Sequence, residues 1–143
     1  MIEPFYGTLR PADKASGAAQ IYHISNETGT GKLTVCPVFA GVELCYNDMH
    51  LAWCNQDQQA ARNVIEINHC RVGRYECSFG ENSCCYLAAG DFAVSAGTRK
   101  KSFSSFPLRH YHGITILLDL DAIAPESRQL MEWFGIDLGA MPR

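Results

Sequence analysis

The sequence predicts a mainly β fold, in which short antiparallel strands build a sandwich or a barrel. Between Val64 and Leu118, short segments with alternating apolar and polar residues are separated by glycine-containing turns. Frequent turns of this kind are typical of antiparallel sheets. Apolar residues recur at helical spacing only after Asp119, which confines the expected helix to the C-terminal end.

The first third of the chain is expected to hold an arm followed by short strands. Residues 1–20 contain several Pro and Gly residues and predict an irregular arm. A strand is expected at Ile21–Ile24, and the composition of Ser25–Gly31 is that of a loop. Two further strands are expected at Lys32–Pro37 and Val38–Tyr46, with a proline between them that suits an edge or a bulge.

The middle of the chain predicts the body of the barrel. Met49–Cys54 is a candidate strand, and the polar segment Asn55–Asn63 is expected to be a surface connection. The strand segments that follow are VIEINHC, YECSF, CCYL, FAVSAG and HYHGITILLD. Together these segments place the barrel within residues 21–119.

The C-terminal residues 120–143 predict a short helix and a tail. Pro125 suits the first turn of a helix, where its missing N–H is not needed, and Glu126 favours the positive end of the helix dipole. Three apolar residues follow at helical spacing, namely Leu130, Met131 and Phe134. The helix is therefore expected over Pro125 to Phe134.

Length and composition predict one soluble domain that spans residues 1–143. The formal net charge is −3, whereas a chain that binds nucleic acid by itself usually carries a basic face. No apolar run has the length of a membrane span, and the N-terminus does not resemble a signal peptide. Seven cysteines without an export signal predict a cytoplasmic location, and an odd number cannot all pair within one chain.

Two sets of segments carry a resemblance to known families. Glu66 to Gly73, then Ala89-Gly90-Asp91, then Ser95 to Gly97, resembles the centre of a cupin barrel. The longer segments EINHCRVGRYE, YLAAGDF and FPLRHYHGITI together resemble the N-terminal sensing domain of AraC-type transcriptional regulators. The resemblance covers nearly the whole chain, and it implies a cupin-like antiparallel double-stranded β-helix (a jelly-roll barrel) with a short C-terminal helix.

The AraC resemblance implies a function as well as a fold. In that family the N-terminal domain binds a small effector or contributes to dimerisation, and a C-terminal pair of helix-turn-helix motifs binds DNA. This chain has no such C-terminal half, because only nine residues follow Phe134. The expected partners are therefore a small-molecule effector, DNA only through a missing domain, and a second copy in the full-length regulator. No enzymatic activity is expected on this basis.

His110 and His112 are the first candidate ligand-binding residues. Residues two apart in a strand share a face, so both imidazoles point the same way. Because Ile114, Ile116 and Leu118 continue that face, we expect the histidines on the buried side, near the barrel mouth. Two such imidazoles can bind a metal ion, line an effector pocket or make structural hydrogen bonds.

The cupin resemblance argues against a bound metal. Metal-binding cupins carry paired histidines ahead of the glutamate and another after the second motif. The matching segments here, residues 60–62 and 99–101, contain no histidine, and only Glu66 matches. We therefore expect no metal, no other cofactor and no catalytic residue. The alternative is a small metal-dependent cupin enzyme, of the isomerase or dioxygenase type, that uses His110, His112 and Glu66.

Glu66 and Asn68 are further candidates for contact with a ligand. They share one face of their strand, although periodicity alone does not show which face is the inner one. A buried carboxylate needs a partner, so Glu66 is expected either to contact the ligand or to form a structural ion pair.

Three aromatic residues, Tyr46, Trp53 and Tyr86, complete the set of candidate pocket residues. Effector pockets are mostly apolar, yet aromatic residues in strands more often belong to the ordinary core, because β-propensity and burial already explain them. The cysteines are expected to act as small buried apolar residues, because none of them forms a C-x-x-C pair.

Overall fold

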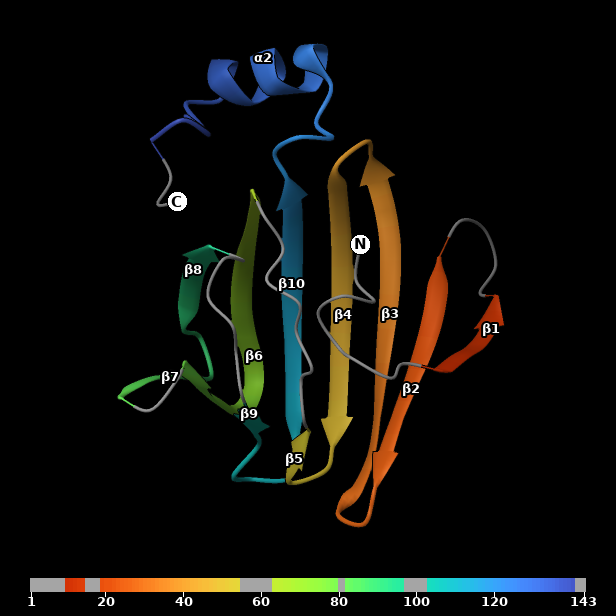
Figure 1. The fold of residues 1–143 in the computed structure, drawn as a ribbon. Coiled ribbons are helices and arrows are strands. Elements are labelled where there is room, and N and C mark those ends of the chain that lie inside the picture. Colours follow the sequence, from red (N-terminus) through yellow and green to blue (C-terminus); the bar gives the residue numbers. More distant parts are fainter. Residues whose placement is uncertain (1–9, 15–18, 55–62, 80–81, 97–102, 141–143) are drawn as a thin grey trace.

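In the part of the chain that the structure describes, antiparallel strands are followed by a short helix (Figure 1). The computed structural model describes residues 10–14, 19–54, 63–79, 82–96 and 103–140. Its elements are β1 (Arg10–Lys14), β2 (Gln20–Asn26), β3 (Gly29–Phe39), β4 (Val42–His50), β5 (Trp53–Cys54), β6 (Val64–Phe79), β7 (Ser83–Ala88), β8 (Phe92–Ala96), β9 (Phe103–Ser105), β10 (Tyr111–Asp119) and α2 (Pro125–Trp133).

The strands form a large sheet and a small sheet that share β6. In the large sheet the order is β1-β2-β3-β4-β10-β6, with β8 also paired to β6. The second half of β6 pairs with β7 and β9, and β9 pairs with β5. This arrangement confirms the expected fold class, a cupin-like antiparallel barrel with one short C-terminal helix.

A bulge in β6 marks the point where that strand passes from one sheet to the other. Its register against β10 shifts between His112 and Gly113, so that Cys70 faces Gly113 while Val72 faces His112. Gly73 follows with a φ of +85°, and a Cβ atom there would lie 1.8 Å from the carbonyl oxygen of His110. Glycine is therefore required where the chain before β10 approaches β6.

The side chains of the larger sheet alternate between an inner and an outer face. The inner core contains Leu33, Cys45, Met49, Cys70 and Leu117, all of them almost fully buried. A second cluster lies on the outer face, where Ile65 and Leu118 pack with Ile123 and Leu138 from the segments around α2. Both faces of the sheet are thus apolar near its helix end.

Several boundaries differ from the sequence prediction. Part of the expected arm is strand β1, and the expected loop at Ser25–Gly31 contains only a tight turn, because β2 and β3 pair from Asn26 and Gly29 onwards. β3 continues past Pro37 to the turn at Gly41. Residues 1–9 and 15–18 of the arm, and residues 55–62 of the polar segment, lie outside the described residues, and the arm ends in the first residue of β2. The helix was predicted correctly to within one residue.

None of the helices in the described part of the chain is both long and apolar enough to span a lipid bilayer.

Candidate functional site

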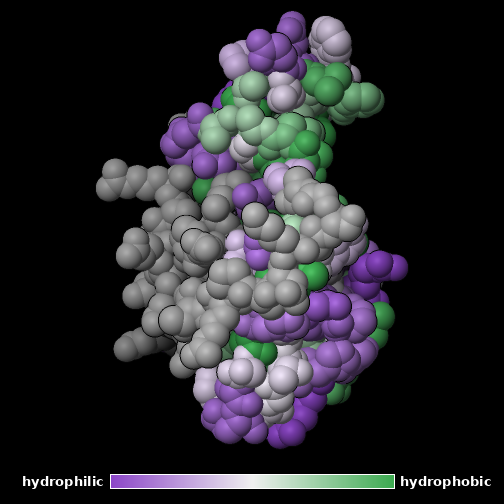
Figure 2. All heavy atoms as spheres, turned by 90° about the vertical axis from the view of Figure 1, so that its right-hand side faces the viewer, coloured by the Kyte–Doolittle hydropathy of each residue, from purple (hydrophilic) through white to green (hydrophobic). Residues whose placement is uncertain are grey.

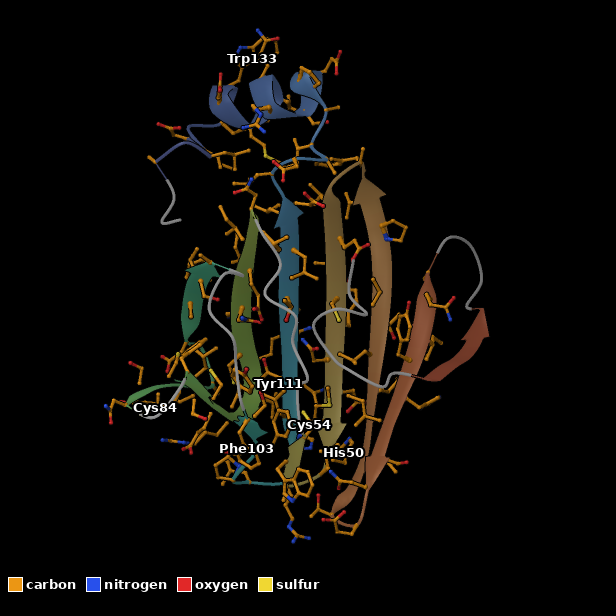
Figure 3. All side chains as sticks on the ribbon, viewed as in Figure 1. His50, Cys54, Cys84, Phe103, Tyr111 and Trp133 are labelled. Carbon is orange, nitrogen blue, oxygen red and sulfur yellow. The ribbon has the colours of Figure 1, made fainter. Side chains whose placement is uncertain are left out.

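Three histidines meet where β4 ends and β10 begins. His50 is the last residue of β4, His112 is the second residue of β10, and His110 lies just ahead of that strand. Each offers a ring nitrogen within 4.8 Å of those of the other two. The ring centroids are 4.8–5.8 Å apart. Figure 3 shows His50 at the lower end of β4, close to the start of β10.

The expectation that His110 and His112 lie on the buried side of the sheet is wrong. The inner face of β10 carries Tyr111, Gly113, Thr115 and Leu117, all buried, whereas His112 belongs to the outer face and is half-buried. The apolar residues that follow His112 misled the prediction, because C-terminal residues partly cover the outer face too. Alternating apolar residues cannot identify the inner face of a sheet that is covered on both sides.

Asp48 ties two of the three histidines together. Its Oδ1 atom lies 2.7 Å from Nε2 of His50 and 2.9 Å from Nε2 of His112. Both Asp48 Oδ1 and His112 Nε2 are shielded from solvent, and among the described residues neither atom has a hydrogen bond of good geometry. A carboxylate this close to one ring nitrogen restricts the orientation of the imidazole and leaves the other nitrogen available to a metal ion.

The remaining nitrogens have a spacing that suits a metal ion. Nδ1 of His50 and Nδ1 of His110 are 3.4 Å apart. Two nitrogens bound to one tetrahedral zinc ion at 2.0–2.1 Å are about 3.3 Å apart. The donor set, three imidazoles supported by a carboxylate, suits zinc, nickel, copper or iron. These residues therefore fit a metal centre after small side-chain rotations.

Sequence analysis missed two members of this cluster, His50 and Asp48. The signal was present, since Asp48 and His50 are two apart in a strand and share a face, as His112 and His110 do. What the sequence did not show is that β4 and β10 are neighbours with Asp48 opposite His112.

Glu66 and Asn68 lie apart from the histidines, on the inner face of β6. A chain of hydrogen bonds connects them to the neighbouring strands. Asn47 Nδ2 donates to Thr115 Oγ1 (2.9 Å), Thr115 Oγ1 donates to Asn68 Oδ1 (2.7 Å), and Asn68 Nδ2 donates to Glu66 Oε1 (2.9 Å). Every donor points towards the glutamate, so the network stabilises a carboxylate in the interior.

The barrel interior around this network is well filled. The space lined by Asn47, Glu66, Asn68, Tyr111 and neighbouring side chains measures only about 10 Å³. That volume suffices for about one water molecule. The described residues therefore leave no room for an effector beside Glu66.

The aromatic candidates lie in three different places. Tyr46 is on the outer face of β4 and is exposed. Trp53 of β5 stacks on Phe103 of β9, with ring centroids 6.1 Å apart. Tyr86 is exposed on β7, with the guanidinium of Arg74 over its ring. Of these three, only Tyr46 shares a face with His112.

None of the seven cysteines, all of which the structure describes, forms a disulfide, and four of them are buried as expected. Burial raises the pKa of the Cys45 thiol far above its ordinary value, and nearby Glu43 adds to the effect. Burial likewise raises the pKa of the Tyr111 phenol. Cys84 departs from the expectation, because it is exposed on β7.

Comparison with known proteins identifies the fold and leaves the family open. No protein-family model matches the chain, and no curated protein matches it. The structure of iron(II) HppE is similar to this chain with a TM-score of 0.54 and 8% identity, and the match covers 79% of this chain and 65% of the HppE chain. A cupin 2 conserved barrel domain protein from Salinispora arenicola matches 78% of this chain and 88% of its own, with a TM-score of 0.47 and 14% identity.

Two further structures represent different functions. Ectoine synthase from P. lautus matches 67% of this chain and 67% of its own, with a TM-score of 0.43 and 12% identity. An HTH_3 family transcriptional regulator from Vibrio cholerae matches 62% of this chain, with a TM-score of 0.47 and 17% identity. The chain spans about half the length of that regulator, 50%.

The expectation that the chain is not an enzyme is contradicted. The HppE structure, which shares the fold, is an iron(II) form, and three histidines of this chain could hold a metal ion. The AraC-type assignment finds no support among these structures, whereas the cupin-like fold does.

Proposed function

We propose that this chain is a metal-binding cupin protein whose metal centre consists of His50, His110 and His112, and that it acts as a small metal-dependent enzyme. The observation that carries the proposal is the meeting of three imidazoles, from the end of β4, the start of β10 and the residue before β10, with Asp48 Oδ1 close to Nε2 of two of them. Catalytic metal sites commonly use three protein ligands and leave a position open for water or substrate.

The residues of the chain have distinct roles in this proposal. His50, His110 and His112 hold the ion, and Asp48 orients two of these ligands through the close contacts of its Oδ1 atom with their Nε2 atoms. When bound, the metal supplies Lewis-acid polarisation of a substrate oxygen or activation of a water molecule. The site lies at a sheet end and is partly exposed, so a small substrate can approach it.

Metal titration tests the proposal. Chelator-treated protein is titrated with Zn²⁺ and with Ni²⁺ in a calorimeter, and we expect one ion per chain. His110→Ala and His112→Ala should each weaken binding by at least tenfold, because a lost ligand or orienting contact costs about 10–100-fold in affinity. His23→Ala is the matched control, since His23 is an exposed histidine of β2. Equal binding by all four proteins, or none, would refute the metal centre.

A second candidate function is the effector-sensing or dimerisation role implied by the AraC resemblance. It is supported by exposed apolar side chains on and after α2, namely Leu130, Trp133, Phe134 and Ile136. Figure 2 shows green side chains gathered at this end of the molecule, and Figure 3 shows Trp133 on the upper side of the helix. Light scattering should then show a dimer that Trp133→Ser dissociates; a monomeric wild-type chain would refute the dimerisation role.

A further inference from the structure

A groove of about 230 Å³ lies on the outer face of the large sheet, next to the histidines. Its floor is formed by β4 and β10, where Asp48 pairs with His112 and Tyr46 pairs with Ile114. The volume is smaller than the roughly 300–1,000 Å³ typical of drug-sized ligands, which suggests a small metabolite.

Two cations stand on opposite sides of this groove. Lys32 lies on β3 directly across from Asp48, and Arg71 lies at the β6 bulge beside the residue that faces His112. The two residues are thus separated by three strand spacings, or about 14 Å between their backbones. Lysine and arginine side chains are long enough to converge over the floor from both sides.

Neither cation has an ion pair within the part of the chain that the structure describes. Both side chains are exposed and extend from the sheet face that carries His112. Asp48, which lies between them, already has its Oδ1 atom engaged by the imidazoles of His50 and His112. Lys32 and Arg71 together carry two positive charges against the single carboxylate of Asp48, so the lining of the groove keeps a net positive charge.

The other lining residues complete a site for a small polar molecule. Thr34 and Tyr46 supply hydroxyl groups on one wall, and Ile114 supplies an apolar surface for a short hydrocarbon segment. Arginine binds carboxylate and phosphate through paired N–H groups, and lysine binds them as a point charge.

We infer that this groove binds a small anionic metabolite, whose carboxylate or phosphate group is held by Lys32 and Arg71. The inference rests on the proposed function and extends it, since it names the class of substrate for the metal centre. The two sites are linked because His112 lines the groove and is also a proposed metal ligand, and Asp48 contacts it. A ligand held in this way lies beside His112, within reach of an ion on the histidines.

Calorimetry with two anions tests the inference on the chelator-treated chain. Sodium malonate and inorganic phosphate are the probes, and uncharged malonamide is the control ligand. We expect at least one of the anions to bind and malonamide not to bind. Arg71→Gln and Lys32→Gln should each weaken anion binding by about tenfold or more, as expected for the loss of a charge-assisted hydrogen bond. The tighter of the two anions identifies the head group.

Matched variants separate this inference from the proposed metal centre. Arg128→Gln removes the same charge from α2, at the other end of the sheet, and should leave anion binding unchanged. His110→Ala should weaken metal binding by at least tenfold and leave anion binding within about twofold, because His110 does not line the groove. Failure of both anions to bind, or equal binding by wild type, Arg71→Gln and Lys32→Gln, overturns the inference. Loss of the metal result alone overturns only the proposed function.

Discussion

Thr115 is the central link of the buried polar network, and Thr115→Val removes only its hydroxyl group while nearly preserving its shape. The side chain is 1% exposed on the inner face of β10. Its Oγ1 atom accepts from Asn47 Nδ2 at 2.9 Å and donates to Asn68 Oδ1 at 2.7 Å. Among the described residues, no other group donates a hydrogen bond to Asn68 Oδ1.

The magnitude follows from the groups that lose a partner. Asn47 Nδ2 loses one acceptor and Asn68 Oδ1 loses one donor, and both side chains are buried. A buried polar group left unsatisfied costs about 1–3 kcal/mol. The apolar valine methyl recovers part of this, so we expect the free energy of unfolding to fall by about 2–4 kcal/mol.

Urea unfolding followed by circular dichroism measures this loss. The midpoint should fall while the slope against urea stays constant, because the change alters stability rather than the surface exposed on unfolding. Thr30→Val is the control, since Thr30 is exposed on β3. If Thr115→Val costs no more than Thr30→Val, the hydrogen bonds assigned to Thr115 do not stabilise the fold.

Four further outcomes are expected. Gly73→Ala should lower the free energy of unfolding by at least about 3 kcal/mol, from strain at a φ of +85° and a clash 1.8 Å from a backbone oxygen, as judged by urea unfolding. Gly90 has a similar φ of +92°, but a Cβ atom there would meet no other atom within 4 Å. Gly90→Ala should therefore lower the free energy of unfolding by only about 1 kcal/mol in the same assay. Cys84 should react first with a thiol reagent in the native protein, and a reactivity unchanged in Cys84→Ser would contradict this. Stability should fall as the pH rises above about 9, because burial raises the pKa of Cys45 and Tyr111 above their ordinary values of 9.0 and 10.0. At this pH the unfolded chain loses protons that the folded chain retains. The explanation would be refuted if the urea midpoint did not fall with rising pH, or if it fell as steeply in Tyr111→Phe as in the wild type.

Local sequence signals predicted the strands and the helix well because each depends on neighbouring residues. Pro125 and Glu126 begin the helix, and the glycine turns near Gly41 and Gly90 separate strands, as their residue types require. The loop expected at Ser25–Gly31 was wrong because polar, glycine-rich residues also fit a strand whose side chains face solvent, as β3 shows near Thr30.

The candidate site depended on information of another kind. His110 and His112 were found from their spacing, but their partners His50 and Asp48 come from a strand about 60 residues away in sequence, as the His50–His110 contact shows. The inner position of Glu66 was left open by periodicity, because both faces of β6 are partly apolar.

The sequence by itself determined a mainly β chain with a cupin-like order of turns, a short C-terminal helix and a pair of histidines on one strand face. Only the tertiary structure decided that this face is the outer one, that β4 lies beside β10, and that Lys32 and Arg71 flank the same groove. The physical reason is that alternation and turn chemistry act between neighbours in the chain. Strand pairing and the covering of a sheet face are instead set by the packing of the whole molecule.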